Sequence, residues 1–228
     1  MMKIWEKHRK RQWIGFYSGS YLAVALAVIG LSGLFMSFNE KGPMNTGHEN
    51  LKCADCHRAA PGSLRQQLQA KVRYGLNTRE TDAVFGHFPA ANEDCLFCHK
   101  RPDDPHPVYR FIEPRFVEAR KELHPQYCVS CHEEHTGKRI TIQTDFCKHC
   151  HEKLVLKNDP LDIPHEKLIA DEKWTGCLGC HDYHGNHVYK TPVLISELIP
   201  YPKITGYFQG EPSPYSQEKK HEPLKEKN

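Results

Sequence analysis

The chain has 228 residues, a mean hydropathy of −0.66 and a hydrophobic content of 39%, which is a low apolar content for a domain that must build a large core from side chains alone. Lysine and arginine number 31 against 28 aspartates and glutamates, so the formal net charge is only +3. This balance argues against a nucleic-acid-binding surface, which needs a marked excess of basic residues.

Residues 1–12 carry five basic side chains against one acidic one, and residues 13–38 carry no charged side chain. As an α-helix the uncharged stretch would be about 39 Å long, enough to cross a hydrocarbon core of about 30 Å. The apolar region of a cleavable signal peptide is shorter, about 7–15 residues, and is followed by small residues. We therefore expect an uncleaved transmembrane signal anchor. Its basic end should stay in the cytoplasm, which places the chain from about residue 39 onward on the outer side of the cytoplasmic membrane.

The middle of the chain predicts short helices joined by loops and little strand. Leu64, Leu68 and Val72 have helical spacing within 62–73. A second helix is expected over 115–124, ending before a proline, and three prolines between 102 and 107 indicate a loop. The expected fold class is mostly α with little regular secondary structure, preceded by one N-terminal transmembrane helix.

The last segment, 189–228, combines many prolines with apolar residues such as Ile195, Leu198 and Ile204. It predicts an extended Pro-rich C-terminal tail rather than a helix. Because its backbone groups must find partners somewhere, we expect it to dock on another subunit. The alternative is a strap across its own domain.

The pattern C-x-x-C-H occurs five times and uses all ten cysteines of the chain. This string is the attachment site of a c-type haem: the two thiols bond to the porphyrin, and the adjacent histidine is the proximal iron ligand. The expected thioether residues are Cys53, Cys56, Cys95, Cys98, Cys128, Cys131, Cys147, Cys150, Cys177 and Cys180. The expected proximal ligands are His57, His99, His132, His151 and His181.

Zinc knuckles are the alternative, because paired C-x-x-C strings also make structural zinc sites. Zinc gives no reason for a histidine after every second cysteine, and neither does a disulfide. Five c-type haems would also account for the low apolar content of the chain, since porphyrin faces can form the core that the side chains do not provide. The expected organisation is a basic cytoplasmic segment (1–12), an anchor (13–38), a pentahaem cytochrome c domain (39–188) and the tail (189–228).

Each iron also needs a sixth ligand or stays open. Met44 is the single methionine outside the anchor and the extreme N-terminus, so at most one iron has a methionine ligand. The distal candidates are His48, His87, His106, His124, His135, His165, His184 and His187; of these, all but His106 and His187 are favoured. His135 and His184 follow a proximal histidine by three residues and should reach a neighbouring haem. The short spacing of the third and fourth motifs favours a closely stacked haem pair.

These motifs resemble those of membrane-anchored multihaem cytochromes c, with C-H-x-x-H units like the cytochrome c3/c7-type group. One N-terminal helix followed by five haems looks most like the pentahaem subunit of alternative complex III. That resemblance implies that this chain relays electrons from a quinol-oxidising partner to an acceptor. NapC/NirT-type quinol dehydrogenases, which usually have four haems, are the second resemblance and would imply a quinol site in this chain.

Two classes of function follow. The first is a non-catalytic electron-transfer subunit that takes electrons from a quinol-oxidising or iron–sulfur partner and passes them to a periplasmic cytochrome or a terminal oxidase. The second is an enzyme: a quinol dehydrogenase, or a multihaem reductase with one open iron. Eight distal candidates for five irons favour the first class.

Overall fold

The computed structural model describes residues 2–31 and 42–224 and divides the chain into two units, Met1–Pro43 and Met44–Asn228. The first unit contains helix α1, Met2–Leu31, in which Arg9–Ile29 is long and apolar enough to span a membrane. This confirms an apolar N-terminal helix. The predicted end of the anchor at residue 38 lies outside the described residues. Trp13 stacks on Tyr17 with ring centres 5.6 Å apart, near the basic end of the helix.

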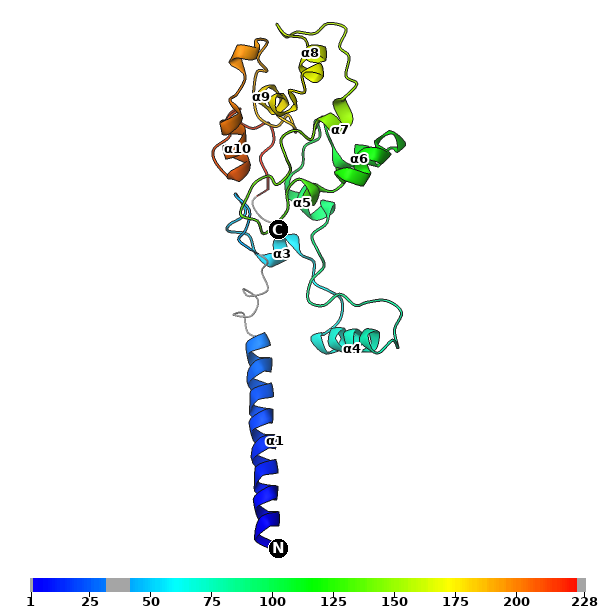
Figure 1. The fold of residues 1–228 in the computed structure, drawn as a ribbon, viewed down its shortest axis with the longest axis vertical. Helices are drawn as coiled ribbons and strands as arrows, with labels where there is room; N and C mark the ends of the chain where they lie inside the picture. The colour runs from blue at the N-terminus through cyan, green and yellow to red at the C-terminus, as the bar shows by residue number, and fades with distance from the viewer. Residues whose placement is uncertain (1, 32–41, 225–228) are drawn as a thin grey trace. The chain divides into compact units, whose positions relative to one another are not determined.

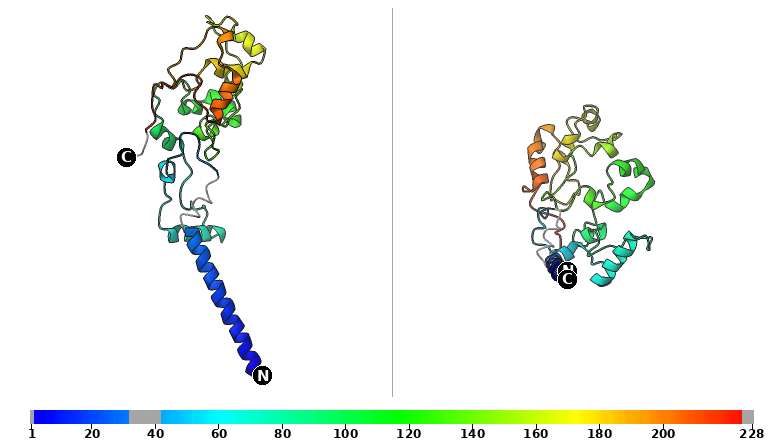
Figure 2. Two further views of the ribbon diagram at one scale, coloured as in Figure 1. Left: turned by 90° about the vertical axis from the view of Figure 1, so that its left-hand side faces the viewer. Right: turned by 60° about the horizontal axis from the view of Figure 1, so that its bottom comes forward.

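The second unit is a chain of short helices joined by loops (Figures 1 and 2), as predicted. Within the described residues there is no strand, only two isolated bridges, Ala59 with His87 and His187 with Lys219. The α-helices are α3 (Cys53–Cys56), α4 (Leu64–Gly75), α5 (Asn92–Cys98), α6 (Val117–Glu122), α7 (Lys148–His151), α8 (His165–Ala170), α9 (Cys177–Cys180) and α10 (Tyr201–Gln209). The 3₁₀ helices are η1 (Val108–Ile112), η2 (Pro114–Phe116), η3 (Cys128–Ser130), η4 (Trp174–Gly176) and η5 (Ile195–Glu197).

The two predicted helices of the middle region form. Helix α4 begins after Ser63, whose hydroxyl accepts a hydrogen bond from the Gln66 backbone N–H while the Gln66 side chain accepts from the Ser63 N–H. This reciprocal capping explains why the helix starts two residues later than predicted. Helix α6 ends at Glu122, before Pro125 as expected, but it is shorter than predicted because the segment before it is taken up by η2.

The prediction of an extended tail is wrong for its central part, where α10 forms. Proline interrupts the interior of a helix, and the prolines of this segment therefore led us to expect an extended chain. Pro200 precedes α10 and Pro202 lies in its first turn, where a backbone N–H has no helical acceptor to lose. The helix ends at Gly210, whose φ of 114° is the left-handed conformation that glycine adopts at helix ends.

Helix α10 packs beside α9 and supplies most of the small apolar core of the second unit (Figures 1 and 2). Ile204 and Phe208 contact Leu178 of α9, and Ile204 is 1% exposed. Arg139 closes the C-terminal end of α10: its guanidinium donates to the carbonyl oxygens of Tyr207 (2.6 Å) and Glu211 (2.7 Å). A cation at this end also complements the helix dipole.

The rest of the tail is bonded along the same unit. The Val188 N–H donates to the Glu218 carbonyl (2.9 Å), and the Leu224 N–H donates to the Cys98 carbonyl (3.1 Å). The tail is therefore bonded to its own unit, as the strap alternative requires, and docking on a partner subunit stays a prediction.

Replacing Ile204 by alanine should lower the free energy of unfolding by about 2–4 kcal/mol, because it opens a cavity at the one large side chain among the described residues that is fully buried. Ile112→Ala is the matched control, since Ile112 is 66% exposed and the same atoms are removed. Guanidinium unfolding followed by circular dichroism gives both values. Equal effects of the two substitutions would mean that α10 does not anchor the tail.

Candidate metal centres

All five C-x-x-C-H strings adopt the same local geometry. In each, one helical turn puts the two cysteines three residues apart on one face, and the N–H of the following histidine donates to the carbonyl of the first cysteine. The N···O distances are 2.8 Å for His57, 3.0 Å for His99, His132 and His151, and 2.9 Å for His181. The turns are α3, the end of α5, η3, the turn into α7, and α9. All ten cysteines are free thiols.

Each proximal histidine lies opposite one other histidine ring. The five pairs, with the distances between ring centres, are His99 with His48 (6.0 Å), His57 with His135 (6.2 Å), His151 with His106 (6.2 Å), His132 with His184 (6.1 Å) and His181 with His165 (6.2 Å). The two members of a pair come from segments between 16 and 78 residues apart in the sequence.

This separation fits one iron between two imidazoles. A ring nitrogen binds a first-row metal at about 2.0 Å, and the ring centre lies roughly 1.1 Å behind it, so two ligands on opposite sides of one ion have centres about 6.2 Å apart. Direct stacking would bring aromatic rings closer: His106 lies 4.3 Å from Tyr183 in a parallel stack. The expected haem group therefore fits the residues present.

A zinc site needs four ligands around one ion. Among residues 2–31 and 42–224, His, Cys, Asp and Glu do not gather in groups of three or more that could hold a metal. The described histidines instead come together as pairs.

Hydrogen bonds at Nδ1 orient several of these rings and leave Nε2 for a metal. His57 donates to the Phe88 carbonyl (2.9 Å) and His132 to the Arg139 carbonyl (2.7 Å). Among the distal rings, His106 donates to the Tyr183 carbonyl (2.8 Å), His165 to the Asp159 carboxylate (2.9 Å) and His184 to the Asp104 carboxylate (2.9 Å).

Burial keeps two of the proximal rings neutral at pH 7, the form in which imidazole binds a metal. Desolvation lowers the pKa of His99 to about 4 and that of His132 to about 4. At His48 the Glu134 carboxylate raises the pKa, against a smaller opposing effect of burial. The Glu134 Oε1 atom lies 3.5 Å from His48 Nδ1.

Residues outside the motifs hold the distal rings in place. Asn45, which is buried, donates from its side chain to the Glu133 carbonyl (2.9 Å) and accepts from the Thr136 N–H (3.0 Å), which fixes the segment that carries His48. Asp104 accepts from His184 and from the His106 N–H (2.8 Å). Although burial of Asp104 acts to raise its pKa, the hydrogen bond and charge of His184 bring that pKa below its usual value.

Five of the eight distal candidates are therefore paired: His48, His106, His135, His165 and His184. Their C-H-x-x-H members behave as predicted, since His135 and His184 each face the proximal ring of another motif. His106, which was not among the favoured six, is paired. A proline on each side places it in a turn, and its N–H is bonded to Asp104.

The predictions for His87, His124 and His187 find no support, because no ring pair with a proximal histidine is found for them within the described residues. His87 forms a backbone bridge with Ala59. His124 has a φ of 48° and bonds Ser130 Oγ through its carbonyl, so it shapes a turn. His187 donates from Nδ1 to Asp182 (3.0 Å) and lies 5.5 Å from the Tyr215 ring.

The pairs are linked to one another along the chain. His132 and His135 belong to different pairs yet are three residues apart, as are His181 and His184. These links join the first motif to the third and the third to the fifth. Two more links come from thiols that lie close enough to shift each other's pKa: Cys128 raises the pKa of Cys95, and Cys177 raises the pKa of Cys147. The cysteine contacts thus join the second motif to the third and the fourth to the fifth, whereas the sequence spacing had favoured the third with the fourth.

Comparison with known proteins adds no relative: no family model, no curated protein and no solved structure matches this chain.

Proposed function

We propose that the chain is a membrane-anchored pentahaem cytochrome c that relays electrons and carries out no substrate chemistry itself. One observation carries the proposal: each of the five C-x-x-C-H histidines has one other histidine ring 6.0–6.2 Å away. Bound haem iron supplies one-electron redox chemistry, and two histidine ligands keep its potential lower than a His/Met pair would.

The residues of the chain divide the work of holding such a group. The ten cysteines fix the porphyrins covalently, and the five proximal histidines lie next to them in the sequence. The five distal histidines bring remote segments to the opposite face. The carboxylates of Asp104 and Asp159 accept hydrogen bonds from the Nδ1 atoms of His184 and His165 and so fix the orientation of these rings.

The pairing favours electron transfer over a reductase. A reductase needs one iron with an open position for its substrate, whereas every proximal histidine here faces a second ring. Met44 is not needed as a ligand, because its neighbour four residues on, His48, faces His99. A quinol dehydrogenase of the NapC/NirT kind remains the second candidate, and the apolar helix α1 is the feature that favours it, since quinols are dissolved in the membrane.

The links between motifs support a connected relay. Through the C-H-x-x-H units and the thiol contacts, the third motif is joined to the first, second and fifth motifs, and the fifth motif is joined to the fourth. We propose that electrons enter from a quinol-oxidising or iron–sulfur subunit and leave to a periplasmic cytochrome or terminal oxidase, with the second unit on the outer side of the cytoplasmic membrane. The basic residues before the apolar part of α1 support that orientation.

Mass spectrometry of the denatured, fully matured protein should give the mass of the polypeptide with its anchor plus five haems, because five cysteine pairs are free to bond. Tryptic peptides should carry one haem at each motif. Four haems or fewer, or zinc in place of haem, would refute the pentahaem assignment. Loss of the N-terminal residues would refute only the uncleaved anchor.

His135→Ala should convert one of the five irons to high spin, since His57 would lose its partner ring. His87→Ala is the matched control and should leave all irons low-spin. Electron paramagnetic resonance of the oxidised protein reads both. His135→Met distinguishes loss of a ligand from misfolding. A methionine at this position can supply the sixth ligand again, so all irons should be low-spin and one reduction potential should rise. A low-spin His135→Ala protein, or a high-spin His87→Ala protein, would contradict the pairing.

A further inference from the structure

Helix α4 presents its polar side chain to the protein and its apolar side chains to the outside. Gln67 is 9% exposed. Its amide donates to the Ala60 carbonyl (2.9 Å) and accepts from the Gly86 N–H (3.0 Å). Leu68, the next residue, is 56% exposed, with Leu64 at 46% and Val72 at 53%. A surface helix of a globular domain shows the reverse arrangement, with its apolar stripe against the core.

The exposed stripe has cations on both sides. At about 100° per residue, Leu64, Leu68 and Val72 lie within an arc of about 80°, with Lys71 about 20° beyond one edge and Arg65 about 20° beyond the other. Arg73 lies farther round the helix. An apolar face flanked by lysine and arginine is the pattern of a helix that lies in a membrane interface, where the cations meet phosphates.

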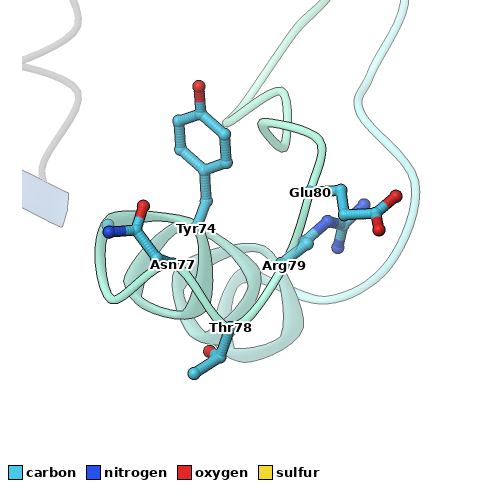
Figure 3. A pocket seen from close by; sticks show the side chains of 6 residues that line it. Tyr74, Asn77, Thr78, Arg79 and Glu80 are labelled. Carbon is cyan, nitrogen blue, oxygen red and sulfur yellow. The ribbon is translucent and has the colours of Figure 1, made fainter.

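The C-terminal end of α4 continues this pattern. Tyr74, Asn77, Thr78, Arg79 and Glu80 spread around a shallow pocket in which polar groups predominate (Figure 3). From 63 to 83 the segment has four basic residues against two acidic ones, Glu80 and Asp82, and Asp82 pairs with Lys71 (2.6 Å). The net positive charge of this segment complements the negative charge of an anionic lipid surface.

The chain itself keeps the second unit near any bilayer that holds α1. From Ile29, the end of the candidate span, to Met44, the start of the second unit, the backbone can reach at most about 50 Å. A tether of this length gives a weak membrane contact a high effective concentration. The tether therefore increases the occupancy of a contact made by three apolar side chains and their flanking cations.

We propose that α4 is an interfacial helix that lies on the outer surface of the membrane, with Leu64, Leu68 and Val72 at the boundary between headgroups and acyl chains and Arg65 and Lys71 at anionic phospholipid headgroups. The proposal rests on α1 acting as the membrane anchor and is independent of haem chemistry. Membrane contact at this helix orients the second unit relative to the bilayer, beside the first C-x-x-C-H motif, whose α3 precedes α4 by seven residues.

The test uses the full-length haem protein in nanodiscs of equal parts phosphatidylglycerol and phosphatidylcholine. The photo-crosslinker p-benzoylphenylalanine replaces Leu68 or, as the control, Gln69, an exposed residue that lies about 100° round α4 from Leu68 and outside the apolar stripe. Illumination should give phospholipid adducts at position 68 about tenfold more often than at 69. Adding Leu64→Gln and Val72→Gln should remove most of the difference, and 0.5 M salt or pure phosphatidylcholine should reduce it.

The same two probes are then used in native membranes. A lipid adduct at position 68 supports the proposal, whereas an adduct with another polypeptide overturns it and makes α4 a subunit-docking helix. Equal lipid labelling at 68 and 69, or none at 68, also overturns it. If alkaline carbonate releases the unlabelled chain from membranes, α1 is not a membrane anchor. If the chain stays in the membrane but position 68 is not labelled by lipid, only the proposal for α4 is wrong.

Discussion

The second unit depends on one constraint: five histidines fixed beside cysteine pairs must each face a histidine from another segment across a gap of about 6 Å. That gap is wider than the 4.3 Å parallel stack of His106 on Tyr183 and equals the width of one metal ion with two imidazole ligands. The constraint decides which loops meet. It brings the first residues of the unit, through His48, to the second motif, and it brings the loop after the fifth motif, through His184, to the third.

The small amount of conventional core makes this constraint more important. The buried apolar cluster consists of Leu178, Ile204 and Phe208, with partly buried neighbours. Many other large apolar side chains of the described residues are exposed, including Leu96, Phe97, Val129 and Val155. Side chains around a covalently bound porphyrin would be covered by it, so the stability we expect comes from ligation and from porphyrin faces as much as from side-chain packing. Arg139 connects the strap to a metal-site residue. Its guanidinium donates to the Tyr207 carbonyl at the end of α10, and its backbone carbonyl accepts the hydrogen bond of the His132 ring.

Much of this could be predicted from the sequence, because covalent motifs and short-range spacing are local. The helical turn at each motif, the apolar N-terminal helix, α4 and the reach of His135 and His184 to other motifs all follow from residues close together in the chain. Which other histidine faces each proximal ring is set by long-range folding. The sequence favoured His87 and His124 over His106. In the structure His87 forms a backbone bridge with Ala59, and His124 shapes a turn. His106 is positioned by the hydrogen bond from its N–H to Asp104. Helix α10 was not predicted, because proline disrupts the interior of a helix, whereas Pro202 lies in the first turn of α10.

Anomalous scattering at the iron edge from crystals of the matured protein tests the central claim most directly. The pairing predicts five iron peaks, each about midway between the rings of one pair: His48 and His99, His57 and His135, His106 and His151, His132 and His184, His165 and His181. An iron bound by one histidine alone, or by His87, His124 or His187, would contradict it.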